Sequence, residues 1–172
     1  HAMAPVGGRA GVLSIREEQV VLAGPAQVEV DVVQFELAAA NALNTGDEAT
    51  LRAAADLYGG DLLPDLPDAG WLYARRAALG ESHREISVKL ATTVQLCAPE
   101  QAFLALAGVL ESDPLHEGAV RAQMKVLAQL GRRSAALARY EQLVDDLLHA
   151  FGTDPDSQTV ALFRRLLAGS PA

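Results

Sequence analysis

Three histidines and one cysteine are the side chains of this chain best suited to metal binding or nucleophilic chemistry. His83, His116 and His149 each stand alone in a helix or turn, without the His-x-x-x-His or Cys–His spacing of a zinc site. We therefore predict surface histidines and no bound metal. Cys97 lies between a leucine and an alanine, with no adjacent base or positive charge to make it reactive. We interpret it as a hydrophobic residue at a helix end.

Hydroxyl, glycine and acidic groupings elsewhere do not form a catalytic pattern. Ser157-Gln158-Thr159 lacks a neighbouring base and is better explained by helix capping. The Gly-Gly pairs at 7–8 and 59–60 are not followed by the Lys-Ser/Thr of a phosphate loop. Glu17-Glu18 and Asp145-Asp146 read as polar surface, because an acid–base pair needs environments that separate two pKa values. The sequence predicts no catalytic residues, no cofactor and no enzymatic activity.

Partner binding is the remaining chemistry, and Trp71, Arg75 and Arg76 are its first candidates. Trp71 could anchor a partner, but burial is the more common fate of Trp, so we interpret it as a core residue beneath the loop at 62–67. Arg75 and Arg76 begin a basic stripe that continues to Arg84. An acidic partner and a solvated or ion-paired helix face explain that stripe equally well.

A second candidate group lies further along the chain. Arg121, Arg132, Arg139 and Tyr140 could face the concave groove with which helical solenoids commonly bind partners. For Tyr140 and Met124 the better interpretation is repeat core, whereas a groove position stays open for Arg121 and Arg139.

Bulk composition narrows the class of protein. The chain has 172 residues, of which 50% are hydrophobic and only 5% aromatic, so alanine and leucine dominate and favour closely packed helices. No apolar run reaches the roughly 18 residues of a membrane span. A single cysteine excludes an intrachain disulfide and fits a reducing cytoplasm. The formal net charge of −8 disfavours contact between this chain and the phosphates of nucleic acid.

A β-hairpin is predicted ahead of the helices. Val12–Ile15 and Gln19–Leu22 favour strands, Arg16–Glu18 is a polar turn, and Gln27–Val30 alternates as a third extended piece. A hairpin alone cannot hide its apolar face and must pack on the helices or on something upstream. We interpret His1–Met3 as a remnant of cloning.

From Asp31 onward the apolar residues follow a helical period, and about seven helices are predicted. Asp31 is the expected N-cap of the first, and Thr45-Gly46-Asp47 ends it and caps the second. The later helices are expected at roughly Asp68–Leu96, Pro99–Glu111, Pro114–Leu130, Arg133–Phe151 and Pro155–Leu167, with proline first in three of them and Asp113 and Asp154 as caps.

A repeat of 34 residues links the later helices. Shifting the sequence by this period pairs Ala102 with Ala136 and Val109 with Leu143. Thirty-four residues is the length of a tetratricopeptide repeat, a helix–turn–helix unit. Small residues at 102 and 136 would allow the paired helices to approach closely. The predicted fold class is therefore all-α and tetratricopeptide-like, with a short N-terminal hairpin; an irregular helical bundle is the alternative.

Several spaced motifs resemble the bacterial transcriptional activator domain. They are Gly60-Asp61-Leu62-Leu63-Pro64, Trp71, Arg75-Arg76 and Leu79; Asp113-Pro114-Leu115-His116-Glu117, Arg121, Met124, Leu127 and Gly131-Arg132; and Ala136-Leu137, Tyr140-Glu141, Gly152, Asp154-Pro155 and Thr159. The family includes antibiotic regulatory proteins of actinomycete type and larger multidomain relatives. The resemblance implies a transcription regulator whose winged-helix DNA-binding domain precedes this region, with the hairpin similar to the last strands of that domain. The region itself would act by dimerisation, by docking on a neighbouring domain or by binding an effector.

These interpretations define a division of the chain and a set of partners. We expect a tag remnant and flexible lead at 1–11, the hairpin at 12–30 and the helical-repeat domain at 31–169. The expected partners are proteins, namely a second copy, the chain's own DNA-binding domain and RNA polymerase, with nucleic acid reached only through the absent domain and no membrane contact. The alternatives are a tetratricopeptide-like adaptor and a sensor module of a larger ATPase or nucleotide cyclase.

Overall fold

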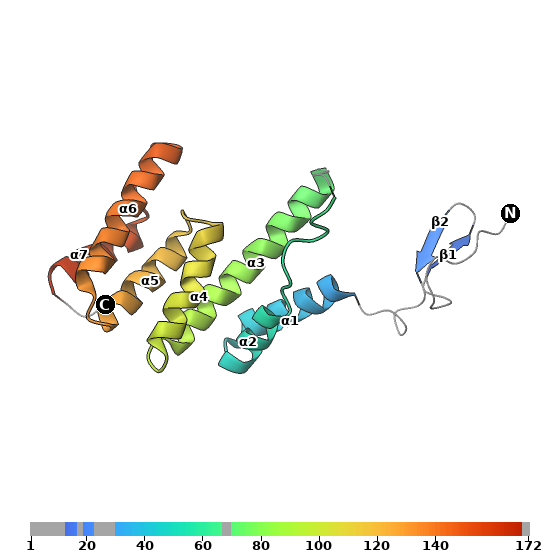
Figure 1. Ribbon diagram of the computed structural model, residues 1–172, viewed down its shortest axis with the longest axis horizontal. Helices are drawn as coiled ribbons and strands as arrows, with labels where there is room; N and C mark the ends of the chain where they lie inside the picture. The colour runs from blue at the N-terminus through green and yellow to red at the C-terminus, as the bar shows by residue number, and fades with distance from the viewer. Residues whose placement is uncertain (1–12, 17–18, 23–29, 67–69, 170–172) are drawn as a thin grey trace.

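Seven helices follow one another along the residues that the computed structural model describes, which are 13–16, 19–22, 30–66 and 70–169 (Figure 1). The helices are α1 (Asp31–Thr45), α2 (Glu48–Asp56), α3 (Gly70–Val94), α4 (Pro99–Ser112), α5 (Glu117–Gln129), α6 (Arg133–Phe151) and α7 (Ser157–Leu167). Each helix packs mainly on its neighbours in sequence. The prediction of an all-helical domain with about seven helices is confirmed.

Two short strands precede the helices. They are β1 (Leu13–Arg16) and β2 (Gln19–Leu22), and they pair antiparallel with Leu13 opposite Leu22 and Ile15 opposite Val20. Glu17 and Glu18 of the expected turn, and most of the extended piece expected at Gln27–Val30, lie outside the described residues.

The junction between the first two helices follows the predicted capping chemistry. Gly46 ends α1 with φ of 71°, a left-handed conformation that glycine adopts without steric cost. The Asp47 carboxylate then accepts a hydrogen bond of 3.0 Å from the backbone N–H of Thr50 and caps α2. Asp31, however, is not a cap. It is the first residue of α1, and Val30 holds the N-cap position without a side-chain hydrogen bond.

Only one of the three prolines expected at helix starts stands there. Pro99 is the first residue of α4, as predicted. Pro114 lies in the turn before α5, where His116 is the N-cap and its Nδ1 accepts from the backbone N–H of Ala119 at 3.0 Å. Pro155 lies before α7, where Asp156 is the N-cap. These two helices therefore begin two to three residues later than the proline signal suggests.

The two aspartates before those prolines also differ from their expected roles. Asp113 stands at the C-terminal end of α4, and its carboxylate accepts a hydrogen bond of 3.2 Å from the backbone N–H of Leu115. This is a local Asx turn, which competes with helix capping for the same kind of side chain. Asp154 lies in the irregular segment between α6 and α7, so Asp156 replaces it as the cap.

Three apolar clusters form the core, and α3 joins the first two. Phe35, Leu51 and Ile86 belong to the cluster of α1, α2 and α3. The second cluster joins α3, α4 and α5, and the third joins α5, α6 and α7. Because α3 is 25 residues long, its first half packs on α1 and α2 and its second half on α4 and α5, as Figure 1 shows. Gly80 lies in the middle of this helix and does not interrupt it.

The repeat register is visible in the core. Ala102 and Ala136, which the 34-residue shift pairs, are both fully buried. Val109 and Leu143, the next predicted pair, are buried as well, so α3–α4 and α5–α6 are equivalent helical hairpins. The same 34-residue shift pairs Leu96 with Leu130, but Leu96 is 83% exposed in the turn before α4 and is not part of the core.

Candidate functional site

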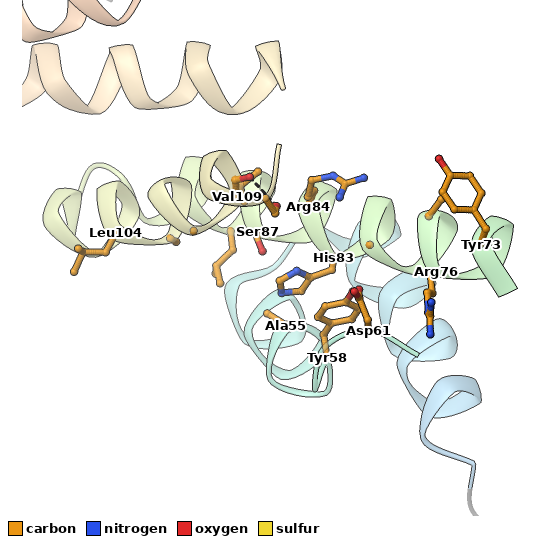
Figure 2. Close-up of a pocket in the computed structure, with 16 residues that line it drawn as sticks. Ala55, Tyr58, Asp61, Tyr73, Arg76, His83, Arg84, Ser87, Leu104 and Val109 are labelled. Carbon is orange, nitrogen blue, oxygen red and sulfur yellow. Dashed lines mark hydrogen bonds between the residues drawn. The ribbon is translucent and has the colours of Figure 1, made fainter. Parts of the chain in front are cut away.

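A groove of about 780 Å³ lies between α2, α3 and α4. Its lining includes Ala77 and Gly80 of α3 and Ala105 and Gly108 of α4, and these small residues leave space along the two helices unfilled. Figure 2 shows Tyr73 and Leu104 at opposite ends of the labelled residues. These end residues are 67% and 70% exposed, so both offer apolar surface to a partner.

An aromatic stack forms one wall of the groove. The rings of Tyr58 and His83 lie 4.2 Å apart and nearly parallel, at 13°, and they face each other in Figure 2. Tyr58 also contacts Phe35 of the core, with ring centroids 5.3 Å apart. Burial lowers the pKa of His83, and the nearby Arg84 guanidinium lowers it further, so the neutral ring is favoured. The wall is therefore a rigid, uncharged aromatic surface at neutral pH.

Charged side chains lie along the same groove. Arg84 donates from Nη2 to Glu81 Oε2 at 2.7 Å, and its Nε lies 4.0 Å from Asp113 Oδ2. Glu81 Oε1 also lies 4.0 Å from His116 Nε2, the ring that caps α5. This network ties α3 to the turn between α4 and α5, and it holds the Arg84 guanidinium at the groove. A partner carboxylate would find an oriented cation there, although Glu81 competes for it.

Arg76 fixes the loop that borders the groove. Its Nε donates to the Leu62 carbonyl at 2.7 Å, and its Nη2 donates to the carbonyls of Leu63 and Leu66 at 2.5 and 3.1 Å. A guanidinium that donates to several backbone carbonyls can fix the conformation of a loop that has no regular secondary structure. Arg76 therefore acts from α3 as a clamp on the 62–66 segment, while it also lines the groove.

Trp71 does not occupy the core position expected for it. Its side chain is 65% exposed near the start of α3, whereas the adjacent Leu72 is 1% exposed and supplies the buried residue of that turn. The clamp on the loop comes from Arg76 instead of from Trp71. Arg75 makes an ion pair of 2.7 Å with Glu36 of α1, with both side chains partly exposed. Of the two explanations for the basic stripe, ion pairing holds for Arg75.

The predicted residues of the second group are spread over separate helix junctions. Arg121 donates to the Thr159 hydroxyl at 2.9 Å, and Arg139 donates to the Pro114 carbonyl at 3.1 Å. Burial lowers the pKa of Arg139. Arg132 pairs with Glu100 at 3.2 Å on the surface. Arg121, Arg132 and Arg139 are not among the described residues that line the groove. Of all the partner contacts predicted from the sequence, only Arg76 lines it.

Tyr140 and Met124 show how the repeat core is completed. Met124 is fully buried, as predicted. Tyr140 is partly buried at the edge of the third cluster and stacks on Phe163 of α7 at 4.1 Å and 16°. The stack covers Tyr140 from the side of α7, so this residue mainly joins α6 to α7.

The histidines and the cysteine need partial correction. His149 is exposed, as predicted, but His83 and His116 are only partly exposed and have the stacking and capping roles described above. Cys97 is exposed instead of packed, and its Sγ lies 3.3 Å from the Val94 carbonyl. Within the described residues no group of three or more His, Cys, Asp and Glu side chains could hold a metal ion. No helix in that part of the chain is long and apolar enough to cross a membrane.

Sequence reasoning missed most of the groove. Three of its lining residues belong to none of the motifs in the sequence, namely Tyr58, Tyr73 and Leu104. The only available signal was the recurrence of small residues, at 77 and 80 in α3 and at 105 and 108 in α4, which marks places where helix packing leaves room.

The whole helical region is similar to known proteins. The model of the bacterial transcriptional activator domain matches residues 30–167, which includes α1 to α7 but not the strand pair. Among solved structures, the chain is similar to Mycobacterium tuberculosis EmbR in complex with a low-affinity phosphopeptide, with a TM-score of 0.77 and 22% identity. That match covers 94% of this chain and 44% of the EmbR chain. A comparison with curated protein sequences found no match.

Proposed function

Because the chain belongs to the bacterial transcriptional activator domain family, we propose that it is the regulatory and protein-contact domain of a bacterial transcription regulator. The observation that carries this proposal is the family match, which extends over all seven helices. The fold likeness to EmbR agrees with it, and the chain spans less than half the length of that protein. Further domains of the regulator would then lie outside the chain.

DNA reading is assigned to a winged-helix domain upstream of α1. The strand pair β1–β2 is the proposed end of that domain, so the boundary falls near residue 30, with a lead at 1–11, the pair within 12–30 and the regulatory domain at 31–169. The net charge of −8 supports this division of labour. An acidic domain repels the phosphate backbone and adds no nonspecific affinity for DNA.

The groove of α2, α3 and α4 is the proposed protein-contact surface. Tyr73 and Leu104 supply exposed apolar anchors, and Arg76 lines the floor between them. Tyrosine and arginine are typical of residues that dominate interface energies. The exposed Trp71 stays a proposed contact near the same end of α3. The other predicted residues already have partners within the domain, so we propose them as contacts only through the parts of their side chains that stay exposed. They are Arg75, Arg121, Arg132, Arg139 and Tyr140.

The proposed partners are the chain's own DNA-binding domain, a second copy and RNA polymerase. Each of these acts where the chromosome is, so we place the regulator in the cytoplasm. The domain would position partners by contact instead of by catalysis, in line with a family that is in general not enzymatic. No cofactor is required for this role.

Two measurements test the proposal. Fluorescence anisotropy with the regulated promoter should show no tight binding by this chain at physiological salt, and tight binding once the natural upstream sequence is joined to it. In the full-length regulator, the double variant Tyr73→Ala with Leu104→Ala should lower promoter activity in a reporter strain without changing DNA affinity. Leu96→Ala is the control, since Leu96 is 83% exposed but lies outside the groove.

Specific and tight promoter binding by the chain alone would contradict the assignment of DNA reading to another domain. Unchanged reporter activity in the double variant, at equal protein abundance, would remove the groove from the proposal.

A further inference from the structure

A second hollow, distinct in position from the groove, lies beneath the loop that follows α2. It measures about 330 Å³ and is lined by α1, by residues 57–64 and by Leu79 of α3. Small-molecule sites in proteins begin at about this size. Tyr58 and Asp61 line both hollows, so this pocket and the groove are separated by the Tyr58 side chain.

Most of the side chains that line this pocket are apolar. Its apolar members are Val32, Phe35, Leu57, Leu62, Leu63, Pro64 and Leu79. The carboxylates of Asp31 and Asp61 are both exposed and are the only acidic groups among the described lining residues, which include no Lys, Arg or His. An apolar body with two carboxylates at its border, in a chain of net charge −8, is complementary to an apolar molecule that carries a cation.

The Tyr58 phenol agrees with a negative local potential. Its hydroxyl donates to Asp61 Oδ1 at 3.5 Å. Burial raises the pKa of Tyr58, and the Asp61 charge raises it further. The Arg84 charge acts in the opposite direction and lowers the Tyr58 pKa. Arg76 approaches the loop from α3 and donates to the carbonyls of Leu62 and Leu63.

A strained leucine stands at the border of the pocket. Leu63 has φ of +50°, and it is the only residue other than glycine with a positive φ in the described part of the chain. Left-handed backbone is unfavourable for leucine and is held here by the Arg76 clamp. The Leu63 side chain nevertheless stays 47% exposed, as does Leu57 at 45%. Strain that leaves an apolar side chain at the edge of a pocket is typical of a site shaped for an occupant.

From these observations we infer that the pocket beneath the 57–64 loop binds a small apolar molecule with a single cationic amine. The apolar body would lie on Phe35 and Leu79 and be covered by Leu57 and Leu63, with the amine at Asp31 and Asp61. This inference does not depend on the groove or on its partners. It gives the domain a ligand site whose loop, through Arg76, is joined directly to α3.

Three indole compounds of one size separate the contributions of body and charge. Tryptamine carries an ammonium group, tryptophol a neutral hydroxyl and indole-3-propionate a carboxylate. Each is titrated into the ¹⁵N-labelled chain while amide shifts are followed. Tryptamine should give saturable shifts at residues 31–35, 57–64 and 79 with Kd of about 1–5 mM. Indole-3-propionate should bind at least about fivefold more weakly than tryptamine, because both carboxylates repel its own carboxylate.

Leu63→Gly tests the border residue without a risk of unfolding. Glycine adopts the left-handed conformation freely, so the thermal midpoint should stay or rise while the Kd for tryptamine rises several-fold. Leu66→Gly is the matched control, since Leu66 is equally exposed in the same loop but does not line the pocket. Asp61→Asn should remove most of the preference for tryptamine over tryptophol.

Four results would overturn the inference. The first is an absence of saturable shifts up to about 10 mM tryptamine, well above the expected Kd. The second is equal affinity for tryptamine and indole-3-propionate, which would remove the cation from the ligand class. The third is an unchanged Kd in Leu63→Gly, which would remove the border residue from the site. Shifts confined to 104–112 of α4 would equally assign the compounds to the groove and away from this pocket.

Discussion

One buried hydroxyl contributes to the attachment of α7, beside the apolar contacts of Leu162 and Leu166, and Thr159→Val tests how strongly. Thr159 is fully buried, donates to Glu117 Oε2 at 2.6 Å and accepts from Arg121 Nη1 at 2.9 Å. Valine keeps the shape of the side chain and removes both hydrogen bonds. Net hydrogen bonds to charged groups are worth about 1.5–3 kcal/mol each. Glu117 and Arg121 remain paired at 3.9 Å and partly hydrated, so we expect a total loss of about 2–3 kcal/mol.

Thermal and urea unfolding followed by circular dichroism measure this loss. For a chain of this size, about 2–4 °C per kcal/mol predicts a midpoint lower by about 4–12 °C. Because α7 is the last helix described, part of the effect should appear as local opening, with faster amide exchange in α7 than in α3. The control is Thr92→Val, whose exposed hydroxyl only bonds the Val88 carbonyl within α3. Equal midpoints for the two variants would refute the reasoning.

Three further predictions follow from the same contacts. Gly80→Ala should stabilise the chain by about 0.5–1 kcal/mol in urea unfolding, because alanine favours the helix and its Cβ would meet only the movable end of Arg84 and the Tyr58 hydroxyl; a loss of stability would contradict this. Ala102→Leu should cost about 1–3 kcal/mol, since the fully buried alanine leaves no room for a larger side chain, and a wild-type melting curve would disprove close packing there. Burial holds the pKa of His83 below 6.5, so its neutral ring stabilises the fold fully above pH 6.5 and less as pH falls through the folded pKa; His83→Gln should flatten that part of a plot of thermal midpoint against pH, and an unchanged slope would count against it.

Sequence pattern predicted the helical elements well because their signals are local. The 3.6-residue period and the Gly46–Asp47 junction depend on neighbouring residues alone, and α6 begins and ends where expected. The helix starts predicted at Pro114 and Pro155 were wrong. Asx turns and helix caps use the same side chains, and which of the two forms depends on the tertiary structure around them.

The candidate site was much less predictable. A groove forms where the side chains of neighbouring helices do not fill the space between them. This depends on tertiary packing, which no local sequence pattern encodes. Trp71 illustrates the point: burial is its usual fate, yet α3 projects at its N-terminal end and leaves this side chain 65% exposed. Arg121 and Arg139 could face a groove by periodicity alone, but Thr159 and the Pro114 carbonyl, distant in sequence, determine where they lie.

The shared position of α3 between two core clusters also affects how the chain can be made. Helix contacts here join neighbours in sequence, which favours fast folding and assembly in order as the chain leaves the ribosome. The first cluster is complete once Ile86 has emerged, but the second half of α3 must wait for α4 and α5. A translation pause just after α3 would therefore expose the apolar residues of its second half, and a gene truncated at that point would yield a product with one complete cluster and one uncovered apolar helix half.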